Sequence, residues 1–198
     1  MTSATGVAFI DLRKRVREAI GQRHRYAHTL RVTRLAVRLA RRHDEDVERA
    51  RVAGMLHDLA RLYSAELLLM ECRARGMPID DFERAHPRVL HARLGAELAR
   101  ERFDVRDERV LTAIRAHTLG AGTMSRLDAI VYLADSLEPD RNFAERAQLE
   151  HLAFQDLEAA MHATLLRTIA HYGASGHAVA PATAAALERF SAKENKTA

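Results

Sequence analysis

The residues best suited to chemistry are an adjacent histidine and aspartate, His57 and Asp58, in the apolar segment 52–61. Apart from Gly54 and Arg61, the other residues of this segment are apolar, which predicts a buried helix. A buried carboxylate is costly unless its charge is compensated, and adjacent helical side chains diverge by about 100°. A bound cation would satisfy both side chains, because it accepts imidazole nitrogen and carboxylate oxygen together.

The alternative is a structural role, in which His57 hydrogen-bonds a carbonyl group and Asp58 caps the next helix. The chain supplies its own comparison in a second dyad, His43-Asp44. That dyad lies in the charged run 41–46, between two helical patterns, and is predicted to be a solvated turn. The apolar setting of His57 and Asp58, rather than the dipeptide itself, therefore indicates a metal site.

Four more side chains of metal-ligand type lie on or at the end of apolar helical segments: His28, His91, His117 and Asp135. Each has a structural alternative, since a lone histidine on a helix face is more often a satisfied core residue, and Asp135 could cap a turn. Neighbouring histidines that could replace two of them are His24 and His86, whereas structural roles are assigned to His151, His162, His171 and His177. Because the pattern recurs in several apolar helices, we expect these side chains to form a metal centre with the dyad.

The composition is that of a soluble globular protein, with 47% hydrophobic and 29% charged residues in a chain of 198. No window approaches the roughly 18 apolar residues of a membrane span. Residues 1–10 lack the basic start and long apolar core of a secretion signal. The single cysteine, Cys72, cannot form an internal disulfide. We therefore expect a cytoplasmic protein that does not bind a membrane.

The charges and the histidines narrow the class of partner. The net charge is +4, and the basic residues are mostly arginines scattered along helix faces. Since only 5% of the residues are aromatic and no stacking pattern occurs, the sequence disfavours nucleic acid. Arginine-rich surfaces also suit small molecules that carry phosphate, and a count of 11 histidines is a compositional indication of metal.

Helical spacing of apolar residues predicts an all-α fold. The predicted helices cover residues 7–20, 24–42, 47–59, 65–75, 87–103, 110–117, 125–135, two segments within 143–172, and 181–190. The expected N-caps include Ser64, Asp107 and Ser125. Without alternating β-branched runs or hairpin dipeptides, we expect a single-domain bundle of roughly eight to ten helices. We expect an N-terminal helical extension at residues 1–20, the main domain at 21–190 and a polar tail at 191–198.

The order histidine, histidine-aspartate, histidine, histidine, aspartate resembles that of the HD-domain metal-dependent phosphohydrolases. The residues that carry the resemblance are 25–30, 53–58, 90–91, 113–120 and 132–141. The most specific of them are a His-Thr-x-Gly segment at 117–120 and an Ala-Asp-x-x-Glu-Pro-x-Arg segment at 134–141. Within this superfamily, the chain is most similar to the YqeK family of symmetrical diadenosine tetraphosphate hydrolases, over about residues 21–190.

The resemblance implies two divalent metal ions and a metal-bridging hydroxide that attacks diadenosine tetraphosphate (Ap4A) at its centre, releasing two ADP. It implies that one ion is held by His28, His57, Asp58 and Asp135, and the other by Asp58, His91 and His117. Six ligands are too many for one tetrahedral zinc and suit two ions that share Asp58. Imidazole and carboxylate ligands without thiolate favour iron or manganese, with cobalt or zinc as substitutes.

Catalytic roles are implied for Asp58, Asp135 and His117, with Asp135 placed to orient the attacking water. Contacts to the phosphates are expected from Arg25, Arg61, Thr118 and Arg141, each of which could instead face solvent or cap a turn. The chain departs from the family at two positions, with Arg61 where lysine is usual and Ala92 where glycine is usual. Arg61 keeps the positive charge but changes the geometry of a phosphate contact.

Several alternatives stay open at the level of sequence. The same fold could hydrolyse a nucleoside monophosphate, a dNTP or a cyclic dinucleotide, although the Gly-Tyr-Pro element of the cyclic-dinucleotide enzymes is absent. It could also be a di-iron oxygenase, or a non-catalytic module that binds a nucleotide or a protein, although the complete ligand set argues against the latter. The expected partner is a small dinucleoside polyphosphate, and a homodimer is possible. The only candidates for contacts to the nucleoside ends are Phe82, Tyr63 and Phe143.

Overall fold

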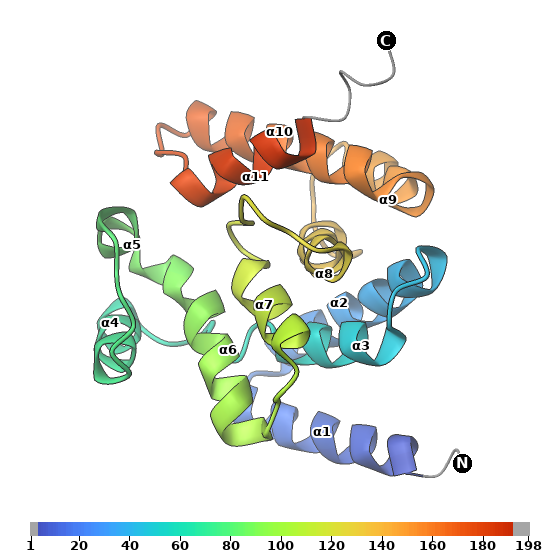
Figure 1. The fold of residues 1–198 in the computed structure, drawn as a ribbon, viewed down its shortest axis with the longest axis vertical. Helices are drawn as coiled ribbons and strands as arrows, with labels where there is room; N and C mark the ends of the chain where they lie inside the picture. Colours follow the sequence, from blue (N-terminus) through green and yellow to red (C-terminus); the bar gives the residue numbers. More distant parts are fainter. Residues whose placement is uncertain (1–3, 192–198) are drawn as a thin grey trace.

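The computed structural model describes residues 4–191, and every regular element in that part of the chain is helical (Figure 1). Eleven α-helices and one 3-10 helix follow one another along these residues, which confirms the predicted all-α fold. The elements are α1 (Ala4–Ile20), α2 (Arg23–Arg42), α3 (Val47–Leu56), α4 (Ala65–Ala74), α5 (Asp81–Ala85), η1 (Pro87–Val89), α6 (Leu90–Phe103), α7 (Glu108–Ala116), α8 (Arg126–Leu137), α9 (Arg146–Gln155), α10 (Leu157–Ala174) and α11 (Pro181–Ser191). Of the predicted polar tail, residues 192–198 lie outside the described part. Within residues 4–191, no helix combines the length and the hydropathy that spanning a membrane requires.

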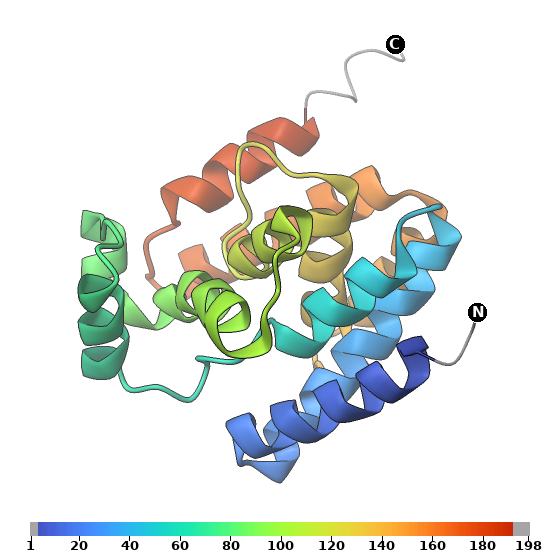
Figure 2. The same ribbon diagram turned by 60° about the horizontal axis from the view of Figure 1, so that its bottom comes forward.

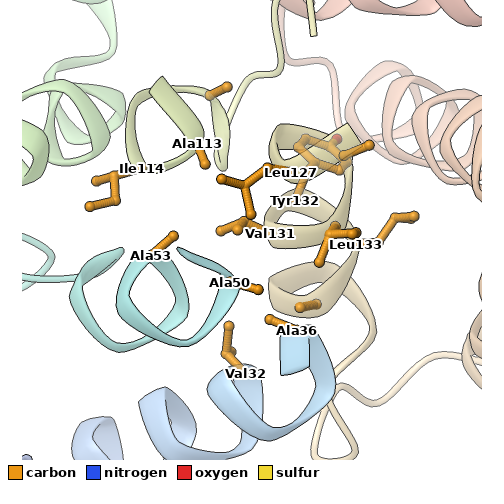
Figure 3. Close-up of a cluster of buried hydrophobic side chains, with 14 of the residues drawn as sticks. Val32, Ala36, Ala50, Ala53, Ala113, Ile114, Leu127, Val131, Tyr132 and Leu133 are labelled. Atoms are coloured by element: carbon orange, nitrogen blue, oxygen red, sulfur yellow. The ribbon is translucent and has the colours of Figure 1, made fainter. Parts of the chain in front are cut away.

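Helix α8 lies at the centre of the bundle, because apolar residues surround its axis on most sides. Figure 1 shows α8 nearly end-on, with α2, α3 and α7 on one side and α9, α10 and α11 on the other. Figure 3 shows the side chains that meet there, among them Val32 and Ala36 of α2, Ala53 of α3, Ile114 of α7, and Val131 and Leu133 of α8. Since α2, α3 and α7 all pack on α8, this helix fixes how their ends lie relative to one another.

The remaining helices surround this centre. Helix α6 packs against α7 and carries α4 on its far side, while α1 runs along α2 and α3 (Figure 2). Val16 of α1 is fully buried against the core. The expected separation of residues 1–20 as an extension of the main domain stays a prediction.

The predicted N-caps are confirmed, because their side chains accept hydrogen bonds from the backbone of the helix that follows. The pairs are Ser64 with Leu67, Asp107 with Arg109, and Ser125 with Asp128. Ser125 and Asp128 form a reciprocal capping box, which sets the start of α8. Short-range signals therefore define where these three helices begin.

The structure differs from the predictions most clearly at three points. Helix α3 ends at Leu56 instead of residue 59, and the chain then forms turns in which the N–H groups of Arg61 and Tyr63 bond carbonyls three residues earlier. Pro87 begins a 3-10 helix rather than an α-helix. Helix α5 was not predicted, because five residues are too few to show a helical period. The bundle thus has one α-helix more than the expected range within the described residues.

Close approach of backbones at Gly54 and Gly95 brings α2, α3 and α6 together around His57. A Cβ atom added at Gly54 would lie 3.0 Å from the Cα atom of Thr33 on α2. A Cβ atom added at Gly95 would lie 3.3 Å from the carbonyl oxygen of His57. Since neither neighbour is a flexible side chain, the lack of a side chain at these glycines permits the observed helix spacing.

We expect Gly54→Ala to lower the free energy of unfolding by about 1–3 kcal/mol, because α2 and α3 must move apart. Gly173→Ala is the matched control: no heavy atom lies within 4 Å of a Cβ atom added there, near the end of α10. This change should leave stability equal or higher by up to about 1 kcal/mol, since alanine favours helix over glycine. Urea denaturation followed by circular dichroism measures both, and equal stability of the two variants would refute the close packing at Gly54.

Candidate metal centre

The six predicted ligands converge on one centre, carried by five helices or by the turns that end them. His28 lies on α2 and Asp135 on α8, while His57 and His117 are the C-caps of α3 and α7. Asp58 follows His57, and His91 is in the first turn of α6. All are buried except Asp135, which is partly exposed. The tertiary fold thus assembles residues that lie up to about 107 positions apart in the sequence.

The two carboxylate oxygens of Asp58 face two separate groups of ligands. Its Oδ2 atom lies 3.6 Å from Nε2 of His28 and 3.6 Å from Nε2 of His57. Asp135 completes this first group, with its Oδ1 atom 3.1 Å from Nε2 of His28 and 3.9 Å from Nε2 of His57. The first group is therefore made of two imidazoles and two carboxylates.

The other oxygen of Asp58 faces the second group. Its Oδ1 atom lies 3.4 Å from Nε2 of His91 and 3.7 Å from Nε2 of His117. The two imidazole nitrogens are themselves 3.3 Å apart. Asp58 thus faces both groups, each with a different oxygen, and His57, Asp135 and His117 also lie close enough to one another to join the groups.

The four histidine rings are held from behind by their Nδ1 atoms. For His57, His91 and His117, Nδ1 donates to the carbonyl oxygen three residues earlier, at 2.6–2.8 Å. For His28, Nδ1 lies 3.1 Å from a carboxylate oxygen of Glu138. A neutral ring that donates through Nδ1 has an unprotonated Nε2, so each ring in its neutral form presents a lone pair toward the centre.

This arrangement fits divalent cations. Unprotonated nitrogens that face one another at 3.3 and 3.4 Å, together with two carboxylates, repel unless positive charge lies between them. Ligands that share one ion at about 2.1 Å are spaced about 3–4 Å apart, and the observed spacings fall in that range. The described residues contain three overlapping sets of histidine and carboxylate groups suited to an ion, and all of them belong to this centre. The donor set therefore fits two divalent metal ions that share Asp58.

The protonation states of His57, Asp58 and Asp135 also suit metal binding, whereas for His117 burial is outweighed by the hydrogen bond to Asp58 and the charge of Asp135, which raise its pKa. Burial lowers the pKa of His57 to about 4, which keeps the ring neutral at physiological pH. Burial by itself would raise the pKa of Asp58, but the neighbouring His57 and hydrogen bonds from His117 and His91 outweigh it and lower that pKa well below its usual range. The pKa of Asp135 is likewise lowered, because His28, His57 and Arg141 outweigh its burial. Neutral imidazole and ionised carboxylate are the forms that bind metal.

Glu138 is a residue of the centre that the sequence analysis did not identify. Its buried carboxylate holds His28 through Oε1 and accepts a hydrogen bond of 2.6 Å from Nε of Arg31 through Oε2. The backbone N–H of Asp140 donates to the same Oε2 atom. A carboxylate behind a metal-ligating imidazole orients the ring and makes it more basic. Glu138 belongs to the Ala-Asp-x-x-Glu-Pro-x-Arg segment, which the sequence analysis singled out. Its contact with His28 could not be predicted, because the two residues lie 110 positions apart in the sequence.

The residues expected to contact phosphate line a cavity of about 420 Å³ above the centre, together with Asp58, His91, His117 and Asp135. Arg25 lies 3.5 Å from Asp58, and Arg141 donates to the carboxylate and the backbone oxygen of Asp135. The hydroxyl of Thr118 lies 3.1 and 3.0 Å from Nε2 of His91 and His117. All four predicted residues, namely Arg25, Arg61, Thr118 and Arg141, share this cavity.

Arg61 differs from the other basic residues of the cavity because it is partly buried and has no hydrogen bond or ion pair to its side chain within residues 4–191. Burial and the charge of Arg25 lower its pKa, although the group stays a cation at physiological pH. A partly buried cation without a partner is poorly compensated by the protein alone. An anionic ligand in the cavity would supply the missing charge.

The two histidines that could have replaced predicted ligands lie outside the ligand groups. His24 is exposed, and the ring of His86 lies 4.6 Å from the ring of Phe82. The second dyad, His43-Asp44, lies in a turn as predicted. Asp44 is exposed, and the partly buried His43 donates a hydrogen bond to the carbonyl oxygen of Ala153. The buried setting therefore separates the two dyads as the sequence analysis expected.

Two of the four histidines that were assigned structural roles line cavities near the centre. His171 contributes to the cavity of the ligands, and His177 to a neighbouring one. Of the aromatic candidates, Phe143 and Phe82 line these same two cavities, whereas the hydroxyl of Tyr63 is bonded to Arg102 at 3.3 Å. No local signal in the sequence marks the cavity-lining role of these residues.

The comparisons with known proteins agree with this geometry. A model of the HD domain matches residues 25–140, a stretch that contains all six ligands. The chain belongs to the HD domain family. It is 34% identical to a symmetrical bis(5'-nucleosyl)-tetraphosphatase of Bacillus subtilis, over 74% of this chain and 78% of that protein. It is 36% identical, with the same coverage, to a protein of the same name from Halalkalibacterium halodurans.

A solved structure extends the similarity to nearly the whole HD-domain chain. The crystal structure of a predicted HD superfamily hydrolase involved in NAD metabolism, from Clostridium acetobutylicum, matches with a TM-score of 0.89. The match covers 93% of this chain and 97% of that one, at 32% sequence identity. The arrangement of helices described above is thus that of a known HD-superfamily hydrolase.

We expect Asp58→Asn to lose most of the bound metal, because both groups of ligands lose the charge they share. Asp44→Asn removes the same charge from the exposed dyad and should keep the metal content of the wild type. Asparagine suits that position, where the backbone has a φ of 52°. Plasma emission spectrometry of the purified proteins measures the content, and full occupancy in Asp58→Asn would show that Asp58 is not shared.

We expect Glu138→Ala to weaken metal binding about 10- to 100-fold, because His28 loses the group that orients it. Glu138→Gln, which keeps an acceptor for Nδ1 of His28, should lose less. Competition with a chelating dye measures the affinity, and Glu66→Ala on the exposed face of α4 serves as control. Equal affinities of Glu138→Ala and Glu66→Ala would refute the role of Glu138.

Proposed function

We propose that this HD-domain protein hydrolyses Ap4A at its central phosphoanhydride and releases two ADP. The observation that carries the proposal is the pair of ligand groups that share Asp58, inside a cavity lined by an unpaired Arg61. The substrate follows from the relatives, which are named symmetrical bis(5'-nucleosyl)-tetraphosphatases. Those matches span about three quarters of this chain.

Six side chains would hold two metal ions, in the partition that the distances suggest. The first group is His28, His57, Asp58 and Asp135, and the second is Asp58, His91 and His117. When bound, such a pair of cations polarises a phosphate and lowers the pKa of water. We propose iron or manganese as the native metal, because the ligands are imidazoles and carboxylates without thiolate. Cobalt or zinc could substitute.

The arginines of the cavity would bind the tetraphosphate. Attack on phosphorus requires that charge on its equatorial oxygens be neutralised. Arg61 is free to do so, since its guanidinium makes no other hydrogen bond in the described chain. Arg25 and Arg141 reach the same space from α2 and from the segment after α8, where they now pair with Asp58 and Asp135. A phosphate that enters the cavity would thus meet guanidinium groups on several sides.

Asp135, His117 and Thr118 would act nearest to the reacting atoms. The partly exposed carboxylate of Asp135 faces the cavity, where it could accept a proton from the attacking water. His117 is held by the carbonyl of Ile114 and presents Nε2 to the same space. The hydroxyl of Thr118 can donate to only one neighbouring Nε2 at a time, so it can turn toward a phosphate oxygen. These side chains would hold and orient the substrate.

Incubation of the metal-loaded protein with Ap4A is the direct test. We expect ADP as the sole nucleotide product on ion-exchange chromatography, with activity lost on chelation and restored by iron or manganese. A mixture of ATP and AMP would contradict central cleavage. Absence of any turnover by protein that retains two metals would contradict Ap4A as the substrate.

We expect Arg61→Ala to lower kcat/KM for Ap4A about 10- to 100-fold, the effect of losing a hydrogen bond between charged groups. Metal content should stay that of the wild type, because Arg61 contacts none of the ligands. Arg61→Lys should retain more activity, since it keeps the charge. The exposed Arg34 on α2 provides a control in Arg34→Ala. Loss of metal from Arg61→Ala would show that the residue supports the centre instead of the substrate.

A further inference from the structure

A second cavity of about 410 Å³ adjoins the cavity of the metal centre and has an opposite character. Its walls are formed by α5, η1, the turn after α7 and the segment that joins α10 to α11, and they are mainly apolar and aromatic. The residues that matter here are Phe82, Ala85, Pro87, Val89, Leu119 and Tyr172. We call it the Phe82 cavity. Volume and lining are those of a small-molecule site rather than of a packing defect.

Shared and adjacent residues connect the two cavities. Tyr172 lines both of them, and Thr118 of the metal cavity is followed directly by Leu119 of the Phe82 cavity. Arg88 lines the Phe82 cavity, and its carbonyl oxygen accepts a hydrogen bond of 2.6 Å from Nδ1 of the predicted metal ligand His91. A ligand that extends from the metal centre past Thr118 and Tyr172 would therefore reach the Phe82 cavity.

Basic groups lie where the two cavities meet. Arg61 belongs to the metal cavity and has no ion pair, and the charges of Arg25 and Arg88 both act on it. Arg88 is exposed, and no hydrogen bond or ion pair holds its guanidinium within residues 4–191. Asp58 pairs with Arg25, but Arg61 and Arg88 have no ion pair within the described residues. Two unpaired cations repel one another unless an anion lies between them. The junction is therefore suited to a chain of phosphates, and the apolar cavity beyond it to an uncharged ring.

The metal cavity also contains groups suited to a nucleoside. Within this cavity, Arg167 stacks on the ring of Phe143, with its guanidinium carbon 3.5 Å from the ring centroid. Thr164 lines the same wall, and its buried hydroxyl has no hydrogen-bond partner in the described residues. One half of a symmetrical substrate can be held by these groups. The other half, beyond the scissile bond, needs a second site.

We propose that the Phe82 cavity binds the purine of the second nucleoside of a dinucleoside polyphosphate, whose phosphates pass Arg61 and Arg88 on the way from the metal centre. The proposal rests on the proposed function and adds a determinant of specificity to it. A purine stacks well on aromatic rings, and Phe82 and His86 present two such rings at this cavity. The cavity would thus distinguish a dinucleotide from a nucleotide with the same phosphates.

Adenosine 5'-tetraphosphate is the probe that isolates the second nucleoside, because it has the phosphate chain of Ap4A and only one adenosine. Cleavage at the same bond gives ADP and pyrophosphate. We expect the wild type to prefer Ap4A in kcat/KM by about 5- to 100-fold, the effect of one stacked base. Phe82→Ala should reduce this ratio to within about twofold of unity. Damage to the metal centre alone would lower both rates and keep the ratio.

Two further variants guard against misfolding. Ala85→Trp fills the cavity from the exposed face of α5 and should reduce the ratio as Phe82→Ala does. Phe154→Ala removes an aromatic ring of α9 that stacks on Arg38, lines neither cavity, and should leave the ratio unchanged. A wild-type ratio in both cavity variants would overturn the proposal. A second outcome would also overturn it. If gel filtration shows that Phe82→Ala converts a dimer to a monomer while the ratio is unchanged, the cavity is a contact between subunits.

A binding experiment separates this proposal from the proposed function. The metal-loaded protein is titrated calorimetrically with an Ap4A analogue that has a methylene group in place of the central bridging oxygen. If Ap4A is not hydrolysed but the analogue binds and Phe82→Ala weakens it at least about fivefold, the Phe82 cavity stands and the proposed function fails. If Ap4A is hydrolysed and Phe82→Ala changes neither the analogue affinity nor the ratio, the proposed function stands and the Phe82 cavity fails.

Discussion

The structure depends on how one buried carboxylate, Asp58, is compensated. Its two oxygens face separate groups of ligands, and each group presents unprotonated imidazole nitrogens at 3.4–3.7 Å. In the protein interior such groups repel one another and the carboxylate loses its hydration. Only positive charge between these groups makes the arrangement stabilising. A scaffold that can hold such side chains together must itself be rigid, which explains why they arise from the central helices of the bundle.

Helix ends do much of this work. His57 and His117 are the C-caps of α3 and α7, and each ring donates to a carbonyl in the last turn of its own helix. Such carbonyls have no partner within the helix, so the end of a helix both supplies the acceptor and aims the ring. Close packing at Gly54 and Gly95 then brings these ends to the same point. His28 is oriented differently, through Glu138 and Arg31, because it lies in the middle of α2.

Two cavities of different character adjoin the candidate metal centre. The cavity over the centre is polar and lined by Arg25, Arg61 and Arg141, which suits phosphate, whereas the Phe82 cavity is apolar and suits an uncharged ring. Ap4A has this same division along its length, with charge in the middle and purines at the ends. Arginine at position 61 fits the junction, since its planar guanidinium can form paired, bidentate hydrogen bonds with phosphate, which a lysine ammonium cannot. Symmetrical cleavage would then follow from where the phosphate chain crosses Asp58.

The sequence by itself determined much of the local structure and singled out the side chains that converge on the candidate metal centre. Apolar periodicity and caps such as Ser125 depend on residues within a turn or two of one another, so they can be read without the fold. The apolar setting of His57-Asp58 likewise separated it from His43-Asp44. Glu138, the end of α3 and the Phe82 cavity could not be read in this way. Each depends on contacts between distant segments, such as His28 with Glu138 across 110 residues, and on backbone spacing that several helices set together. Only the tertiary structure decides which side chains those contacts bring together.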